Sequence, residues 1–279
     1  MKQVNIVISK LRPFPGNPYK VRDDIEMDNL TQSIRESGIL TPLIVRPIEN
    51  TDEYEVISGH RRLHAAQKAG ITEVPALIYA LDRDAAAIAV VDSNLHREHI
   101  LPSEKAFAYK LKRDAMAHQG RTSPQLGEKS LTVEKIGAEA GDSKNQVLRY
   151  IRLTHLIPEL LDLMDEGKIA LMVGEALSYL GDEEQYAVLE QCEINDCTPS
   201  YAQAVEMKKR YQDENLTAEN ISETLSREKA NQRETIKIPT EKLRKYAPNA
   251  DAKQLEDFIL KACEYYRKFL IRQRNRDER

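Results

Sequence analysis

The alternation of short strands with helices stops near Leu101-Pro102, and this change constrains the fold more than any other feature of the sequence. Upstream, runs rich in β-branched residues alternate with helical periodicity, whereas downstream the strand signals nearly vanish. The expected strands are residues 4–12, 43–46, 54–57 and 74–79. The sequence therefore predicts an α+β chain, with an α/β domain over 1–101, a helical domain over 102–213, and a linker with a C-terminal amphipathic helix over 214–279.

Residue types at helix ends indicate where several helices begin and end. Gly38 is suited to end a helix that starts at about Met27, and Gly70 to end the next helix. A third helix is expected over 84–91. Ser103 is expected to cap the first helix of the second domain.

Composition limits the classes of function. Lys and Arg number 41 against 45 Asp and Glu, a net charge of −4, so any binding of nucleic acid must come from local patches of positive charge. The sequence contains no apolar run near the ~20 residues that a membrane span requires, and we expect a cytoplasmic protein. Cys192, Cys197 and Cys263 lack a His at ligand spacing and are expected to be reduced thiols.

A strand, a glycine turn and a helix follow one another over residues 53–66. Gly59 would let a ligand approach the main chain, and the helix after it begins with unpaired backbone N–H groups. Arg61 and Arg62 add forked donors suited to phosphate oxygens. An isolated Gly-Arg-Arg run is more often a solvated helix face, so the anion site depends on its context.

A helix-turn-helix is expected over residues 132–156. Thr132 can cap a helix over 133–140, Gly141-Asp142 makes the turn, and a second helix starts at Ser143. The apolar positions that would hold the two helices together are Ile136, Ala140, Val147 and Ile151.

The second of these helices is basic and carries amides near its start. Such residues read base edges in the major groove or hold phosphates, and the alternative is a helical hairpin with an exposed basic face. Recognition helices usually act in pairs on symmetric sites, so double-stranded DNA and a second copy of the chain are the expected partners. The candidate DNA-binding residues are Thr132, Ser143, Lys144, Asn145, Gln146, Arg149 and Arg152.

The last predicted helix, residues 253–276, carries an apolar stripe rich in aromatic residues. It could form a dimer or pack on its own chain.

Taken in order, these motifs resemble the ParB family of partition proteins over most of residues 10–185. Residues 17–22 (NPYKVR) look like the first family motif and 33–46 follow its helix-to-strand pattern. Residues 59–65 (GHRRLHA) correspond to the phosphate motif GERRxRA, and 93–100 (SNLHREHI) to ENxQRxxL. The helix-turn-helix lies where the family has it.

The resemblance implies a ParB/sulfiredoxin-like N-terminal fold and a CTP-dependent DNA clamp that binds a palindromic centromere-like site for DNA segregation, on a plasmid, mobile element or chromosome. Sulfiredoxin-like thiol chemistry is excluded, because Gly59 stands at the Cys position. CTP and Mg²⁺ are the implied cofactors, with Asn94 as the metal ligand. The implied nucleotide-binding residues are Thr41, Pro42, Gly59, His60, Arg61, Arg62, Asn94 and Arg97.

The sequence departs from the family motifs at three positions. His60 replaces a Glu, and Ser93 and His96 replace a Glu and a Gln. Because Ser93 removes a hard oxygen ligand of the kind that Mg²⁺ favours, nucleotide binding is expected more firmly than a weak CTPase activity. The family often recruits a ParA-type ATPase through a basic N-terminal arm, and the residues before Pro13 contain no Arg-rich stretch.

Two other classes of function stay open. One is a transcription regulator of a mobile element with a vestigial nucleotide pocket. The other is an enzyme; a nuclease is disfavoured because Asp82, Asp84 and Asp92 are scattered rather than clustered around a metal. A zinc site is ranked below structural or nucleotide-contacting histidines, because no third local ligand accompanies the pair His60 and His64 at i,i+4. The histidines considered are His60, His64, His96 and His99.

Overall fold

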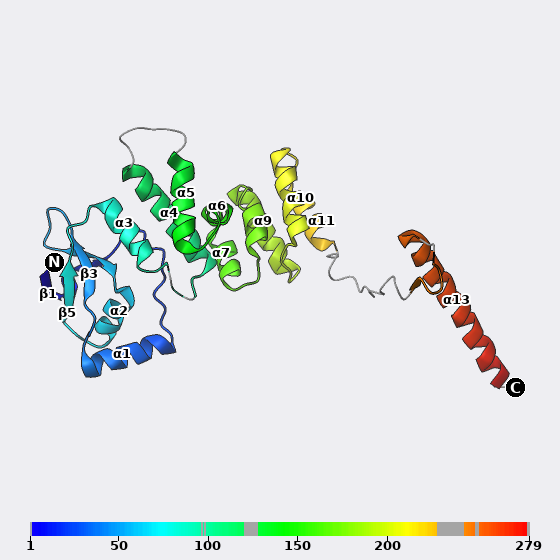
Figure 1. Cartoon of the computed structure of the whole chain (residues 1–279), viewed down its shortest axis with the longest axis horizontal. Helices are drawn as coiled ribbons and strands as arrows, with labels where there is room; N and C mark the ends of the chain where they lie inside the picture. The colour runs from blue at the N-terminus through cyan, green and yellow to red at the C-terminus, as the bar shows by residue number, and fades with distance from the viewer. Residues whose placement is uncertain are drawn as a thin grey trace. The chain divides into compact units, whose positions relative to one another are not determined.

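The computed structural model describes residues 2–95, 97, 99–119, 128–227, 243–248 and 251–277 (Figure 1). His96 and residues 228–242 of the expected linker lie outside the described residues. Residues 1–227 form one compact unit and residues 228–279 a second. The described helices contain none that is both long and apolar enough to span a membrane.

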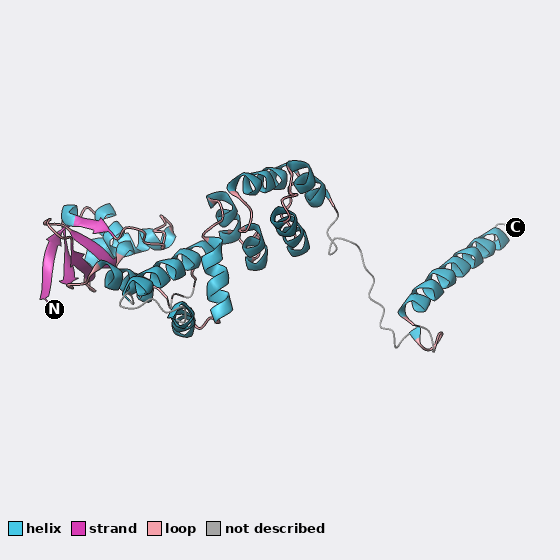
Figure 2. Ribbon diagram, turned by 90° about the horizontal axis from the view of Figure 1, so that it is seen from above, coloured by secondary structure: helices cyan, strands magenta, loops and turns pink. Residues whose placement is uncertain are grey.

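The N-terminal part contains a five-stranded mixed sheet with the strand order β1-β5-β3-β4-β2. β1 pairs antiparallel with β5 and β3 with β4, while β5–β3 and β4–β2 are parallel. The strands are β1 (Lys2–Val7), β2 (Leu11–Pro13), β3 (Leu43–Pro47), β4 (Tyr54–Ser58) and β5 (Glu73–Ile78). All are magenta in Figure 2, and in the described part of the chain only helices and loops follow.

The expectation of a single strand over residues 4–12 is wrong. A 3-10 helix, η1 (Ile8–Lys10), separates β1 from β2, and these two strands occupy opposite edges of the sheet. The alternation of apolar side chains at Val4, Ile6 and Ile8 extends into the 3-10 helix, so the pattern did not show where the chain leaves one edge and crosses to the other.

Helices cover both faces of the sheet. α1 (Ile25–Ser37) and α2 (His60–Lys68) pack together, with Met27, Leu63 and Val56 buried in one core. On the other face, α3 (Arg83–Asp92) lies between the sheet and the next helix, with Ile57 and Val90 buried in a second core (Figure 1). Neighbouring residues of β4 thus serve opposite cores, which confirms an α/β arrangement closed on both sides.

The later part of the first unit is built of eight helices among the described residues. They are α4 (Pro102–Gln119), α5 (Glu128–Ala140), α6 (Lys144–Leu153), α7 (Pro158–Asp165), α8 (Leu171–Leu177), α9 (Asp182–Ile194), α10 (Tyr201–Gln212) and α11 (Ala218–Ser226). The predicted α+β class is confirmed. α11 lies beyond residue 213 in the expected linker, and it packs on α9 and α10 through buried Ile221 and Leu225.

Two expected helix caps are wrong. α4 begins at Pro102, and Ser103 lies inside it, where its backbone N–H and hydroxyl donate to the Asp165 carboxylate at 2.9 and 2.6 Å. α5 begins at Glu128, four residues before Thr132. In both cases the helix runs further than its local sequence indicates, and for α4 a residue distant in sequence satisfies the exposed N–H group.

α4 is the helix that joins the sheet domain to the helical part, since it packs on α3, α5, α6 and α7. Its buried Lys112 forms ion pairs with Asp92 at the end of α3 and Glu139 in α5. One turn earlier, the Tyr109 hydroxyl donates to Asp142 at 2.5 Å. These polar contacts fix α5 and the turn after it to the same helix that packs on α3.

The second unit contains α13 (Ala252–Asp277), in agreement with the predicted closing helix. Its aromatic residues Tyr265, Tyr266 and Phe269 are exposed.

Candidate functional site

The turn between β4 and α2 has the backbone geometry of an anion site. Gly59 has φ of 103°, and a Cβ there would come within 3.0 Å of Leu43 Cγ and 3.2 Å of Arg62 Nη2. The first intrahelical bond runs from the Leu63 N–H to the Gly59 carbonyl, which leaves the three preceding N–H groups at the positive end of the helix dipole. This position therefore requires glycine, and it presents donors to a negative ligand.

Arg62 connects this turn with the loop before β3. Its Nη1 donates to the carbonyl oxygens of Pro42, at 3.0 Å, and Thr41. The side chain is half-buried, and burial lowers the pKa of the guanidinium, which nevertheless keeps its charge at neutral pH. The structure thus brings Thr41, Pro42, Gly59 and Arg62 together, as the resemblance implies.

Arg61 points to another neighbour. Its Nη2 lies 3.1 Å from Glu26 Oε2 and 3.9 Å from Asp24 Oδ1 at the start of α1. Because carboxylates already pair with this guanidinium, Arg61 is not joined to the Arg62 cluster in this structure.

His60 carries a buried acceptor without a partner. Its Nε2 is buried and makes no hydrogen bond to any described residue. Burial, with a smaller contribution from the positive charge of Arg97, lowers the pKa of His60 to about 4, against the effect of a hydrogen bond with the Val56 backbone. The imidazole is therefore neutral at pH 7.

The second predicted phosphate segment follows α3. Asn94 is buried, and its Nδ2 donates to the Val90 carbonyl at 2.8 Å and to Ser93 Oγ at 3.0 Å. Arg97 lies over the ring of Tyr19, 5.4 Å from its centroid, and its charge acts on His60. The positive charge of Arg97 in the second predicted segment thus acts on His60 in the first.

Tyr19 is a residue of this site whose role the sequence did not reveal. Burial is the main cause that raises its pKa, and its hydroxyl donates to the Val91 carbonyl at 3.4 Å. The next residue, Lys20, donates its backbone N–H to Glu104 Oε1 of α4 at 2.9 Å. The NPYKVR motif was the only available signal, and it did not indicate that the tyrosine ring supports an arginine.

The described residues do not fit a metal held by protein ligands alone. They contain no group of three His, Cys, Asp or Glu side chains placed to hold an ion. The Asn94 amide nitrogen is used at the end of α3, and Asp92 pairs with Lys112. His64 bonds Asp23 at 3.0 Å, away from His60. A magnesium ion here would need oxygen ligands from a bound phosphate.

The helix-turn-helix forms around its predicted apolar positions. Ile136, Val147 and Ile151 are buried in one core, and Ala140 packs against it. Ser143 caps α6, its hydroxyl accepting from the Gln146 N–H at 3.2 Å.

The predicted DNA-binding residues fall into two groups. Ser143 to Gln146 occupy the start of α6, where Lys144 forms an ion pair with Glu134 at 2.9 Å. Arg149 pairs with Glu175 of α8 at 3.1 Å, and Arg152 donates to the Ser178 carbonyl at 2.7 Å. Thr132 lies inside α5 and is partly buried.

The fold defines a mixed-sheet domain with an anion-binding turn, joined by one long helix to a helix-turn-helix. Residues 1–95 match the family model described as the ParB N-terminal domain. Residues 1–95 therefore belong to the ParB N-terminal domain family.

The relatives that it matches include proteins named as partition proteins. The chromosome-partitioning protein Spo0J of Thermus thermophilus is 36% identical over 183 residues, 65% of this chain and 62% of that protein. The probable chromosome 1-partitioning protein ParB of Deinococcus radiodurans is 33% identical over 203 residues, 72% of this chain and 65% of that protein. The chain thus spans less than two thirds of these relatives, and a plasmid or mobile-element origin stays a prediction.

Similar solved structures include ParB from Caulobacter crescentus in two complexes. The complex with the centromeric parS site has a TM-score of 0.43 at 24% identity, covering 74% of this chain and 99% of that chain. The complex with CTP-gamma-S has a TM-score of 0.33 at 28% identity, covering 68% and 98%.

Proposed function

We propose that this chain is a dimeric DNA-partition protein, which reads a palindromic centromere-like site through α5 and α6 and binds CTP at the Gly59 turn. CTP binding changes the closure of the dimer on DNA. The membership of the N-terminal domain in the ParB family and the partition proteins among its relatives support this assignment. The observation that carries it is the Gly59–Arg62 turn.

The cluster at the Gly59 turn suits the phosphates of a nucleotide. Backbone N–H groups at the start of α2, the guanidinium of Arg62 and the guanidinium of Arg97 supply positive charge. A Cβ at position 59 would come within 3.2 Å of Arg62 Nη2 and would displace the guanidinium that the phosphates need. Residues Thr41, Pro42, His60 and Asn94 would complete the binding site, and Arg61 would join it only after leaving Glu26. CTP supplies a triphosphate charge and the oxygen ligands for Mg²⁺.

α4 offers a route from this site to the helix-turn-helix. At its N-terminal end Glu104 accepts from the Lys20 N–H, next to the tyrosine that supports Arg97. Seven residues before the end of α4 at Gln119, Lys112 joins α3 to α5. A ligand that shifts Arg97 or the end of α3 would therefore displace α5 as well.

The DNA-reading surface is the start of α6, where Asn145 is exposed, Lys144 and Gln146 are partly exposed, and the helix contains no acidic residue. A second copy of the chain would supply the other half-site reader. We assign the dimer contact to α13, whose exposed aromatic stripe suits a second copy of itself. CTP hydrolysis is not part of the proposal, because Ser93 stands at the family carboxylate position.

Nucleotide titration tests the proposal. CTP binding by the full chain should weaken at least tenfold in Arg62→Ala and in Arg97→Gln, since a hydrogen bond to a charged group is worth about 1.5–3 kcal/mol. Arg35→Gln, on the outer face of α1, is the control and should bind CTP as the wild type does. The two variants separate ligand contact from folding, because Arg97 is exposed while Arg62 also holds the Thr41 loop. Absence of CTP affinity in the wild type, with and without DNA, would contradict the nucleotide part.

One observation favours a second function, a transcription regulator with a vestigial pocket. Ser93 and Asn94 bond to each other and to the end of α3, which leaves them committed to the helix end. Under this alternative, CTP would change neither the affinity for DNA nor crosslinking of the dimer on closed DNA.

A further inference from the structure

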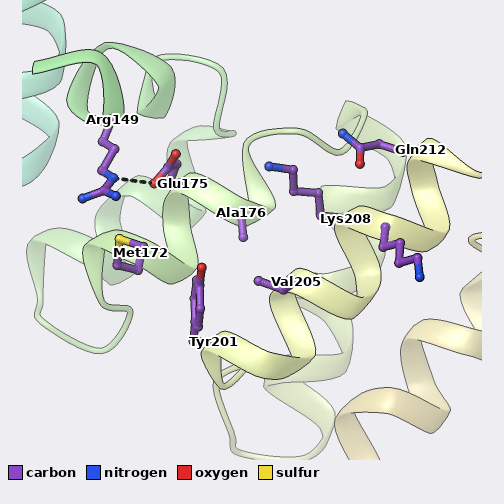
Figure 3. A pocket seen from close by; sticks show the side chains of 9 residues that line it. Arg149, Met172, Glu175, Ala176, Tyr201, Val205, Lys208 and Gln212 are labelled. Carbon is purple, nitrogen blue, oxygen red and sulfur yellow. Dashed lines mark ion pairs between the residues drawn. The ribbon is translucent and has the colours of Figure 1, made fainter. Parts of the chain in front are cut away.

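Two open grooves adjoin the recognition helix. The first lies between α6, α8 and α10 and is lined by Arg149, Glu175, Tyr201 and Lys208, among others (Figure 3). The second runs along α6 and includes Arg149 and Glu175 as well. Because the grooves share these two residues, they form one continuous surface from the start of α6 to α10.

The cations on this surface outnumber the carboxylates. Glu175 is the one carboxylate among the described residues that line the two grooves, and Arg149 already pairs with it at 3.1 Å. On α10, Lys208 and Lys209 line the first groove, and no ion pair joins either to a described residue. This local excess of positive charge occurs in a chain whose net charge is −4.

A tyrosine holds two of these cations close together. The Lys208 ammonium lies 3.4 Å from the centroid of the Tyr179 ring, and the Arg152 guanidinium lies 4.1 Å from the same centroid. Each cation is attracted by the ring, but the two repel each other. An anion beside them would relieve this repulsion, so the cluster is suited to bind one.

The second groove also has an excess of positive charge around it. His155 lines it, and its pKa is lowered first by burial and then by the charges of Arg152, Lys110 and Arg113. Three cations on α4 and α6 thus act on one side chain.

We propose that α10 is a second DNA-contacting element, in which Lys208 and Lys209 bind backbone phosphates beside the major groove that α6 enters. The inference rests on the proposed DNA-binding function. α10 packs on α8, which packs on α6, so the lysines extend the surface of the recognition helix sideways. The major groove is about 12 Å wide and is rimmed by phosphates, which places charge where this extended surface would meet the duplex. A line of cations continuous with a base-reading helix fits a duplex better than a small anion.

Arg210 provides a matched control, because its charge, unlike those of Lys208 and Lys209, is paired with a carboxylate of a described residue. This residue follows Lys209 on α10, but its guanidinium pairs with Glu206 at 2.7 Å. Removing the Arg210 charge changes the net charge of the same helix without removing a groove cation.

The test compares full-length wild type, the double variant Lys208→Gln/Lys209→Gln, and Arg210→Gln by fluorescence anisotropy. The probes are a 40-base-pair duplex recovered from genomic fragments that the wild type retains, and a random duplex of equal length. The double variant should bind both duplexes several-fold more weakly, with the same preference between them. Its log-affinity against log-salt slope should fall by about 2, since each phosphate contact contributes about 0.9. Thermal melts check that all three proteins are folded.

The outcomes separate the inference from the proposed function. If the wild type binds DNA and the double variant shows the wild-type salt slope, or no more loss than Arg210→Gln, the α10 contact is refuted while the helix-turn-helix reader stands. If only the preference for the recovered site changes, α10 does not act through phosphates. Failure of the wild type to bind either duplex would overturn both.

Discussion

Replacing His60 by Gln should flatten the dependence of folding stability on pH. In the folded chain the pKa of His60 is lowered to about 4 from an ordinary value of 6.5, mainly by burial. The unfolded chain therefore takes up a proton on this side chain at a higher pH than the folded chain does. As the pH falls through 6.5 toward 4, the unfolded state gains protons first, and the free energy of unfolding decreases.

The size of the effect follows from the difference between the two pKa values. One pKa unit corresponds to about 1.4 kcal/mol, so the difference between 6.5 and 4 amounts to about 3 kcal/mol when the pH is below 4. About 2 kcal/mol of this is lost between pH 7 and pH 5. Glutamine fills a similar space but does not titrate. The variant can be less stable than the wild type at both pH values. Between pH 7 and pH 5, however, its free energy of unfolding should decrease by about 2 kcal/mol less than that of the wild type.

Urea unfolding followed by circular dichroism at pH 7 and pH 5 measures this difference. His99→Gln is the control, because the His99 side chain is exposed and its variant should lose stability as the wild type does. The contributions of the other titratable groups to the change in stability cancel when each variant is compared with the wild type over the same pH interval. If the wild type and His60→Gln lose the same stability between pH 7 and pH 5, the inference of a buried, neutral His60 imidazole is refuted.

Three further substitutions test the fold around the two sites. Gly59→Ala places a Cβ 3.0 Å from Leu43 at a positive φ, and it should cost about 1–3 kcal/mol in urea unfolding and weaken CTP binding. Lys112→Ala should cost about 2 kcal/mol through lost packing and lost ion pairs, with Lys112→Met costing less. Gly137→Ala brings a Cβ within 2.5 Å of the Asp142 carbonyl and should lower DNA affinity by opening the helix-turn-helix; unchanged affinity would contradict this reading of the turn.

Local patterns predicted the elements whose ends are determined locally. Gly38 ends α1 with φ of 69°, and the apolar spacing of the helix-turn-helix matches its buried core. The features that were not predicted depend on contacts with residues distant in sequence or on a change in the direction of the chain. The Ser103 N–H is satisfied by Asp165, 62 residues away, and η1 redirects the chain between β1 and β2. α11 has three buried residues, Ile221, Thr224 and Leu225, in a polar stretch, which a pattern cannot distinguish from a linker.

At the candidate site, too, the sequence did not predict which residues the long side chains contact. The sequence identified the Gly59 turn, because glycine there is a matter of backbone geometry. It could not determine where each arginine points, since a guanidinium reaches whichever acceptor the fold places nearby. Arg62 binds carbonyls of the Thr41 loop, whereas Arg61 pairs with Glu26 and Arg152 bonds Ser178. Neighbours in sequence therefore carry different contacts.

Genome-wide DNA occupancy of the wild type and of Arg62→Ala tests the central claim most directly, because it examines nucleotide control and DNA binding together. We expect the wild type to spread broadly around one site, since a closed dimer can leave its loading site along the duplex. The Arg62→Ala chain should keep a narrow peak at that site, because α5 and α6 are unchanged. A sharp peak of the same width in both proteins would contradict a CTP-controlled clamp and identify a static DNA-binding protein.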